Sequence, residues 1–280
     1  MREVNVKDIS DAVRDLSIES NCVLGEAEVN YIKKMLDVEE SATGKEILSM
    51  LLENARIARE EGIAICQDTG FAVVFIELGQ DVHLVGGDLG EAVSDGVARG
   101  YTEGYLRKSI LSDPIKRVNT GDNTPPVIHL TIVPGEKVKV TFAPKGGGSE
   151  NMSEVRMLKP SDGIEGVKDF VVERVVKSGG NPCPPIVVGV GIGGTFEKCA
   201  YLAKKALLRP LGERHPDPFY ADIEEELLRR INESGVGPQG LGGRVTALDV
   251  HVETHPCHIA SLPAAVNLNC HATRHGERII

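Results

Sequence analysis

Three cysteines stand in polar or proline-rich surroundings where their thiols could bind a metal. Cys66 is followed by Gln-Asp-Thr-Gly, Cys183 lies within Gly-Asn-Pro-Cys-Pro-Pro, and Cys270 lies within Asn-Leu-Asn-Cys-His. None belongs to a CxxC pair, which argues against a zinc ribbon or a thioredoxin-type redox site. Three thiolates from separate loops can hold three corners of an iron–sulfur cube, and the open fourth iron would be a Lewis acid.

Two side chains directly after Cys66 are candidates for acid–base chemistry. Gln67 and Asp68 bring an amide and a carboxylate next to a metal ligand, where they could orient water or transfer a proton. The alternative for Asp68 is a turn residue that caps Gly70. Arg107 could bind a carboxylate with its guanidinium fork, although alone it could equally be a surface arginine.

Two glycine-rich segments are candidate anion sites. In Lys145-Gly-Gly-Gly-Ser149, consecutive glycines let backbone amides approach a carboxylate, and a flexible hairpin exit is the alternative. Residues 189–194 match GxGxxG, but a dinucleotide fingerprint also needs a second strand that ends in an acidic residue about 20 positions later, and residues 207–213 contain a proline and no predicted strand. We therefore favour a tight strand-to-helix turn whose amides face an anionic ligand.

Residues 251–258, His-Val-Glu-Thr-His-Pro-Cys-His, resemble a metal site. On a strand, His251, Glu253 and His255 would share one face, so a zinc site is one interpretation. The favoured interpretation is that one histidine reaches the active site and the others are solvated or packed. Cys199 lies in a predicted helix and is expected to be a small core residue.

Hydrophobic periodicity predicts an α+β fold with a helical N-terminal region packed with mixed β-sheets. Val-Pro-Gly-Glu between two strand patterns predicts a β-hairpin. We expect one domain over residues 1–280, with possible lobes at 1–145 and 150–280. Helices are expected within the first sixty residues and at 88–109, 164–175, 195–208 and 219–231. Strands are expected at 71–78, 127–132, 137–142, 186–190, 245–252 and 264–268.

Composition narrows the class of protein. A net charge of −10 over 280 residues disfavours a nucleic-acid surface, which needs clustered Lys and Arg. No apolar run approaches the roughly 20 residues that span a bilayer, and the N-terminus lacks a secretion signal. The six cysteines are therefore expected to be reduced thiols or metal ligands in a cytoplasmic protein.

Several motifs in order resemble one known family. They are the Cys66 segment, Val118-Asn-Thr-Gly-Asp-Asn-Thr-Pro125, the 145–149 glycines, the Cys183 segment and Gly191-Ile-Gly-Gly-Thr195. The chain resembles the α subunit, or N-terminal half, of the iron–sulfur hydro-lyases that comprise class I fumarate hydratase and L(+)-tartrate dehydratase. The resemblance runs from roughly Asp8 to Arg274 and implies an iron–sulfur hydro-lyase α-subunit-like fold.

The resemblance implies a [4Fe–4S] cluster with three cysteine ligands and an open fourth iron that takes the substrate's carboxylate and hydroxyl. Transferred residue by residue, the ligands would be Cys66, Cys183 and Cys270. The substrate contacts would be Gln67, Asp68, Arg107, the backbone at Gly147, and His258.

Single-chain relatives continue into a second half that contributes a catalytic threonine and further arginine and lysine contacts. The present chain is 280 residues long, so the resemblance implies a heteromer with a separate β subunit. The first expectation is reversible hydration of fumarate to (S)-malate, a tricarboxylic acid cycle reaction, and the alternative is L(+)-tartrate dehydratase. Two further alternatives belong to other classes of protein. One is a non-catalytic iron–sulfur sensor or scaffold, and the other, least favoured, is a zinc-binding module.

Overall fold

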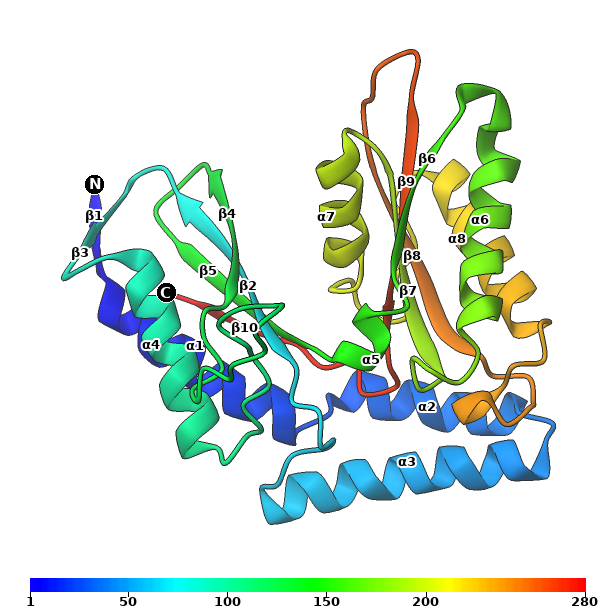
Figure 1. Ribbon diagram of the computed structural model, residues 1–280, viewed down its shortest axis with the longest axis horizontal. Coiled ribbons are helices and arrows are strands. Elements are labelled where there is room, and N and C mark those ends of the chain that lie inside the picture. Colours follow the sequence, from blue (N-terminus) through cyan, green and yellow to red (C-terminus); the bar gives the residue numbers. More distant parts are fainter. The chain divides into compact units, whose positions relative to one another are not determined.

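The computed structural model describes residues 1–280 and confirms a mixed α and β fold with long N-terminal helices (Figure 1). The helices are α1 Val6–Cys22, α2 Glu26–Val38, α3 Ala42–Glu61, α4 Leu89–Glu103, α5 Gly147–Glu150, α6 Gly163–Ser178, α7 Phe196–Ala206 and α8 Pro218–Asn232. The strands are β1 Arg2–Asn5, β2 Phe71–Gly79, β3 Val82–Val85, β4 Val127–Val133, β5 Val138–Lys145, β6 Glu154–Leu158, β7 Ile186–Gly193, β8 Ala247–His255, β9 Leu262–Asn269 and β10 Gly276–Ile279. None of these helices is both long and apolar enough to cross a membrane.

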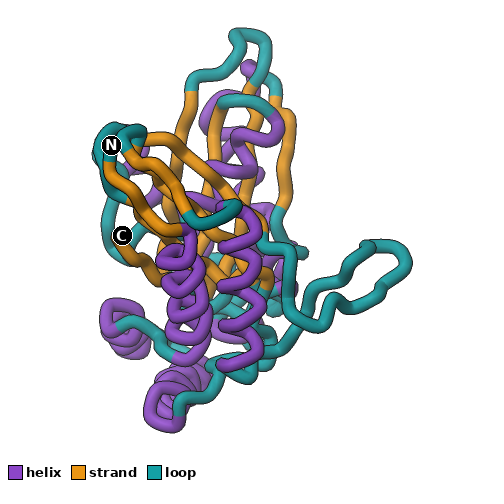
Figure 2. The backbone as a smooth tube through the Cα atoms, turned by 90° about the vertical axis from the view of Figure 1, so that its left-hand side faces the viewer, coloured by secondary structure: helices purple, strands orange, loops and turns teal.

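The chain divides into two compact units that are discontinuous in sequence. Unit 1 contains residues 1–24, 55–147 and 274–280, and unit 2 contains residues 25–54 and 148–273. One boundary falls within the glycine-rich segment after Lys145. The expected lobes differ from these units because residues 25–54 group with unit 2 and the last seven residues group with unit 1. Both chain ends therefore lie in unit 1 (Figure 2).

Unit 1 is built on a four-stranded sheet in the order β10-β5-β2-β4. The predicted hairpin is wrong: both strands form, but β2 lies between them, antiparallel to β5 and parallel to β4. The turn after β2 lies against the connection between β4 and β5. A side chain on Gly79, at the end of β2, would meet the carbonyl of Gly135 in that connection. A central position suits β2 because its apolar residues are mostly buried, whereas β4 is largely exposed and lies at an edge.

Helices α1 and α4 pack side by side on this sheet (Figures 1 and 2). Their close approach requires glycine, because a Cβ on Gly96 would lie 2.5 Å from the Ser10 carbonyl oxygen and one on Gly100 2.7 Å from Ser17 Cβ. Helix α4 ends at Glu103, six residues before the expected Ser109, where Gly104 caps it. Alternate strand residues complete the core, namely Ala72, Val74, Ile76, Val138, Val140 and Phe142.

Unit 2 has three layers around a sheet in the order β6-β9-β7-β8 (Figure 1). Helices α6 and α8 cover one face, and α7 packs on the other. Strand β7 is parallel to β8 and antiparallel to β9. Its eight residues are nearly all buried because helices cover both faces, which explains its continuous apolar pattern.

A buried glutamate anchors the α2–α3 connection to the rest of unit 2. The Glu39 carboxylate is 1% exposed and accepts the amides of Glu40, Ser41, Arg244 and Val245 at 2.7–3.0 Å. It also lies just before α3, where the helix N-terminus favours a negative charge. Burial raises the pKa of Glu39, but the four amide hydrogen bonds outweigh it and leave the pKa below its ordinary value.

We expect Glu39→Gln to destabilise the protein at neutral pH, because a glutamine oxygen and amide group cannot accept all four amides. The loss should be about 1–3 kcal/mol. A depressed pKa contributes stability above the ordinary value near 4.5, and this contribution disappears as the pH falls through the folded-state pKa. The difference between wild type and variant, measured by urea unfolding, should therefore narrow from pH 6 to pH 3. Glu40→Gln, at an exposed ion pair with Arg244, is the matched control and should change little. A constant difference across this range would contradict the prediction.

Candidate functional site

The Cys66 segment is a turn in unit 1 that connects α3 to β2. The half-buried Cys66 thiol donates to Gln67 Oε1 at 3.2 Å, and its sulfur accepts the Asp68 amide at 3.4 Å. An amide directed at sulfur stabilises a thiolate. Gln67 itself is exposed, so its side chain is open to a ligand beside the thiol.

Asp68 is a turn residue that also reaches the glycine-rich segment. Its Oδ1 accepts the Gly70 amide at 2.9 Å, and its Oδ2 accepts the Gly147 amide at 2.7 Å. The structure therefore brings together Gln67, Asp68 and Gly147, three of the predicted site residues. The glycine-rich segment is not a flexible loop, because residues from Gly147 form the single helical turn α5.

Residues that the sequence analysis did not single out hold this turn. Tyr101 is wholly buried on α4, and its hydroxyl donates to the carbonyls of Thr69 and Gly70 at 2.6 and 3.1 Å. Burial raises the pKa of Tyr101, so it stays a neutral donor. Asn123, also wholly buried, donates to the Gly70 carbonyl at 3.2 Å and accepts the Ser109 amide at 2.7 Å. The sequence motif that contains Asn123 was recognised, but nothing in the sequence predicted that Asn123 contacts the Cys66 turn.

Arg107 lies next to the Cys66 turn but not on a helix. Its backbone carbonyl accepts the Thr69 hydroxyl at 2.9 Å, after the end of α4. Its side chain is exposed. The helix expected over residues 88–109 would have included Arg107, but Gly104 ends α4 three residues earlier.

Arg274 is a further buried residue at the turn. It is 5% exposed, and its Nη2 donates to the Asp68 carbonyl at 2.6 Å. Its Nε and Nη1 are buried without a hydrogen-bond partner. The only sequence signal is its place in the polar segment Cys270-His-Ala-Thr-Arg274, immediately after a predicted metal ligand.

In unit 2, strand pairing brings Cys183 and Cys270 to neighbouring positions. Strand β7 begins just after Cys183 and β9 ends just before Cys270, and Val187 pairs with Asn269. The Cys183 carbonyl accepts the backbone amide of His271 at 3.3 Å. Cys183 is exposed in a left-handed conformation with φ of 57°, and Cys270 is half-buried. Two thiols thus lie at the same end of one sheet.

His258 lies at the opposite end of that sheet from Cys270. It belongs to the exposed connection between β8 and β9, where its Nδ1 accepts the Ala260 amide. The eight residues of β9 separate this connection from Cys270 by roughly 26 Å, at about 3.3 Å per residue. Within unit 2, His258 and Cys270 therefore lie on opposite sides of β9, and the contact of His258 with substrate stays a prediction.

The other histidines of the 251–258 segment do not form the alternative zinc site. His251 is wholly buried, with its ring nitrogens 3.2 Å from the Ala206 carbonyl and 3.1 Å from Asp249. Glu253 pairs instead with Arg209 at 2.6 Å. His251 is thus a packed core residue. Cys199 is wholly buried, as expected, and burial raises the pKa of its thiol.

The first two glycines of the GxGxxG pattern serve packing. A Cβ on Gly189 would lie 2.0 Å from the Ala203 carbonyl oxygen, and one on Gly191 would lie 2.0 Å from that of Cys199. Both positions therefore let α7 approach β7 closely. The Gly194 amide, which we expected to face an anion, donates to the His255 carbonyl at 3.2 Å.

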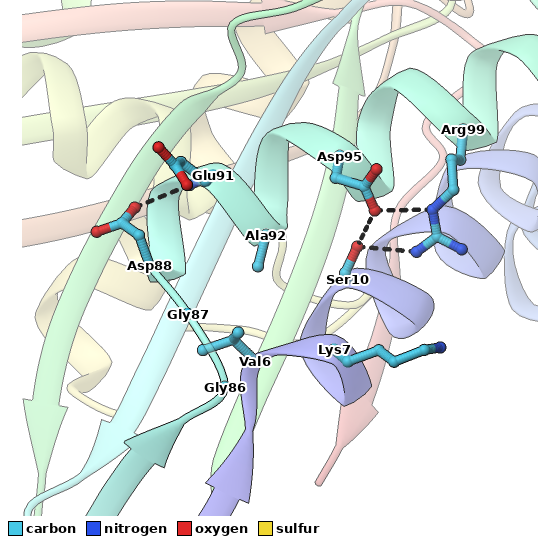
Figure 3. Close-up of a pocket in the computed structure, with 10 residues that line it drawn as sticks. All are labelled: Val6, Lys7, Ser10, Gly86, Gly87, Asp88, Glu91, Ala92, Asp95 and Arg99. Atoms are coloured by element: carbon cyan, nitrogen blue, oxygen red, sulfur yellow. Dashed lines mark hydrogen bonds and ion pairs between the residues drawn. The ribbon is translucent and has the colours of Figure 1, made fainter.

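A cavity of about 330 Å³ in unit 1 lies away from these residues, at the beginnings of α1 and α4 (Figure 3). Its cationic side chains are already neutralised: Arg99 binds Asp95 and Asp11, and Lys7 binds Asp11. None of the predicted site residues lines it. The predicted site residues therefore form two separate groups, the Cys66 turn in unit 1 and the end of the unit 2 sheet that carries Cys183 and Cys270, each held by its own contacts.

Comparison with known proteins gives a consistent result. The family model described as fumarate hydratase (fumerase) matches residues 10–278. A Methanocaldococcus jannaschii protein, whose name gives it provisionally as an L(+)-tartrate dehydratase subunit alpha, is 43% identical over 272 residues, covering 95% of each chain. L(+)-tartrate dehydratase subunit alpha of Escherichia coli O157:H7 is 35% identical over 256 residues, covering 90% of this chain and 84% of the relative.

Removing the Tyr101 hydroxyl should destabilise unit 1 and loosen the Cys66 turn. Tyr101→Phe removes the buried donor of the Thr69 carbonyl and leaves the Gly70 carbonyl with Asn123 alone, so we expect a loss of about 1–3 kcal/mol in the free energy of unfolding. Tyr105→Phe is the matched control, because Tyr105 is 95% exposed. Chemical denaturation of the two variants checks this expectation, and equal stabilities would contradict it.

Proposed function

The chain belongs to the fumarate hydratase family of iron–sulfur hydro-lyases, and on this premise we propose that it is the α subunit of an enzyme acting on a four-carbon 2-hydroxy dicarboxylic acid. The match over residues 10–278 carries this proposal, because it includes all three cysteine motifs. The reaction breaks a C–O bond, releases hydroxide from one carbon and removes a proton from the next.

We propose Cys66, Cys183 and Cys270 as the ligands of a [4Fe–4S] cluster. None of the three forms a disulfide, and the β7–β9 register supports a shared role for the last two. The unpaired buried charge of Arg274 under the Cys66 turn supports an anionic group there. Such a cluster supplies an open iron that acts as a Lewis acid on the departing hydroxyl.

The chain's own residues would bind and orient the substrate around these ligands. Gln67 is exposed beside the Cys66 thiol, and Arg107 is exposed next to the same turn, where its fork suits a carboxylate. Asp68 uses both oxygens on backbone amides, so its first role is to hold Gly147 against the turn. Its proposed second role is to relay a proton. His258, at the far end of β9 from Cys270, stays a proposed substrate contact.

The names of the relatives favour L(+)-tartrate as the substrate. Both are described as tartrate dehydratase alpha subunits, so the first expectation from the sequence, fumarate and (S)-malate, becomes the second candidate. The description of the family model supports that second candidate. L(+)-tartrate has one more hydroxyl than (S)-malate. An active site distinguishes these two acids well only when it forms a hydrogen bond to that hydroxyl.

We also propose a separate β subunit as partner. The relatives are named as alpha subunits, which supports a heteromeric enzyme. In this arrangement the partner supplies a threonine as the base that removes the carbon-bound proton, together with arginine and lysine contacts to carboxylate. The chain described here supplies the metal ligands and the Gln67, Asp68 and Arg107 contacts.

Serine replacement of each proposed ligand tests the cluster. Cys66→Ser, Cys183→Ser and Cys270→Ser should each abolish activity and reduce bound iron and sulfide, because a hydroxyl is a poor cluster ligand. Cys257→Ser is the matched control, since Cys257 is exposed and lies with His258 in the β8–β9 connection. Iron and sulfide analysis of anaerobically reconstituted protein measures the effect. Full cluster content in all three variants would refute the ligand assignment.

A direct comparison of substrates tests the reaction. We expect the complex with the β subunit to turn over L(+)-tartrate with a kcat/KM at least about tenfold above that for (S)-malate, a difference of about 1.4 kcal/mol in transition-state binding. The reverse ratio would identify a fumarate hydratase. Turnover of neither acid by a complex with a full cluster would favour the sensor or scaffold and reject the enzyme proposal.

A further inference from the structure

Arg274 is a buried cation with unusually few partners. It makes one hydrogen bond, to the Asp68 carbonyl at 2.6 Å, while Nε and Nη1 have none. At 5% exposure, water does not solvate its charge. A buried charge without a carboxylate partner is costly, so a protein retains one where it serves a purpose or meets an anion.

Electronegative groups lie near Arg274 within unit 1, but no carboxylate forms an ion pair with it. The residues after it lie against the end of α1, where a Cβ on Gly276 would be 3.0 Å from Ser20 Oγ. The last turn of α1 has no basic residue of its own, and the carbonyl end of a helix attracts a cation. Ser20 Oγ and Asn21 Oδ1 are buried there without partners. The charge of Arg274 also lowers the pKa of the nearby Cys22 thiol, although burial, the larger effect, raises it.

Arg274 is linked to the Cys66 thiol through a single residue. Its guanidinium binds the Asp68 carbonyl, and the amide of the same residue is directed at Cys66 sulfur at 3.4 Å. Asp68 in turn binds the amides of Gly70 and Gly147. A displaced Asp68 would therefore disturb the thiol, the turn and the glycine-rich segment together. The two unpartnered nitrogens are inaccessible, so Arg274 is not placed to bind substrate directly.

We propose that Arg274 is a positioning residue that holds the Cys66–Asp68 segment in the conformation that binds the cluster, and that supplies a fixed positive charge beneath an anionic metal site. The role in cluster binding rests on the proposed function. The role in holding the segment does not, because it concerns the chain's own hydrogen bonds.

Backbone hydrogen exchange in the cluster-free, full-length chain tests the positioning role. In Arg274→Gln we expect the amides of Asp68, Gly70 and Gly147 to exchange at least about tenfold faster than in wild type, while the amides of β2 remain protected. Arg274→Lys, which keeps the charge and one donor, should give an intermediate increase. Arg278→Gln is the matched control, because Arg278 lies on β10 in an exposed ion pair with Glu19 and does not contact the turn. If Arg274→Gln unfolds, so that the β2 amides also lose their protection from exchange, then exchange in Arg274→Lys decides whether Arg274 has the positioning role. Wild-type exchange at the three amides in the deciding variant would overturn the proposal.

Cluster retention gives the second measurement. After anaerobic reconstitution of the complex with its β subunit, Arg274→Gln should lose iron about tenfold to 100-fold faster than wild type, the range found when residues that orient metal ligands are removed. Arg274→Lys should lose iron more slowly than Arg274→Gln but faster than wild type, and Arg278→Gln should lose iron at the wild-type rate. Unchanged retention in Arg274→Gln alongside a full wild-type cluster would overturn the proposal and leave the proposed function intact. A wild-type protein that binds neither iron nor sulfide would instead reject the proposed function, and hydrogen exchange would still decide the positioning role.

Discussion

The turn from Cys66 to Gly70 must be held by groups outside itself, because it belongs to no helix or strand whose hydrogen bonds would fix its backbone. The residues from Cys66 to Gly70 meet this requirement with donors from three distant segments. Tyr101 comes from α4, Asn123 from the long connection before β4, and Arg274 from the C-terminal segment. The sheet of unit 1 and its two helices position these donors, so the turn depends on nearly every part of the unit.

The two thiols of unit 2 are brought together by strand pairing. Cys183 and Cys270 lie in connections of little regular structure, but each adjoins a strand of the unit 2 sheet. Because β7 and β9 are antiparallel neighbours, the start of one lies beside the end of the other. Their register alone brings residues 87 positions apart in sequence next to each other. The same rule places the connection that contains His258 at the opposite end, since it precedes β9.

Glycine has two separate uses in this chain, and sequence pattern does not distinguish them. Gly189 and Gly191 match a nucleotide fingerprint, yet they are small so that the backbone of α7 can approach β7. Gly96 and Gly100 have the same use between α4 and α1. Gly147, in contrast, leaves its amide exposed to the Asp68 carboxylate at the predicted site. The atom that lies next to each glycine shows whether that glycine serves close packing or leaves its amide available for a hydrogen bond.

The sequence by itself determined the type and approximate place of most helices and strands, because their apolar residues repeat with the period of each structure. It also determined the family and the three cysteine motifs, whose local chemistry is carried by adjacent residues. Tertiary structure alone decided that β2 separates β4 from β5, that His251 is a core residue, and that Arg274 reaches Asp68. These facts depend on contacts between segments far apart in the chain. Local periodicity contains no information about which strand becomes a neighbour or which buried donor meets which carbonyl.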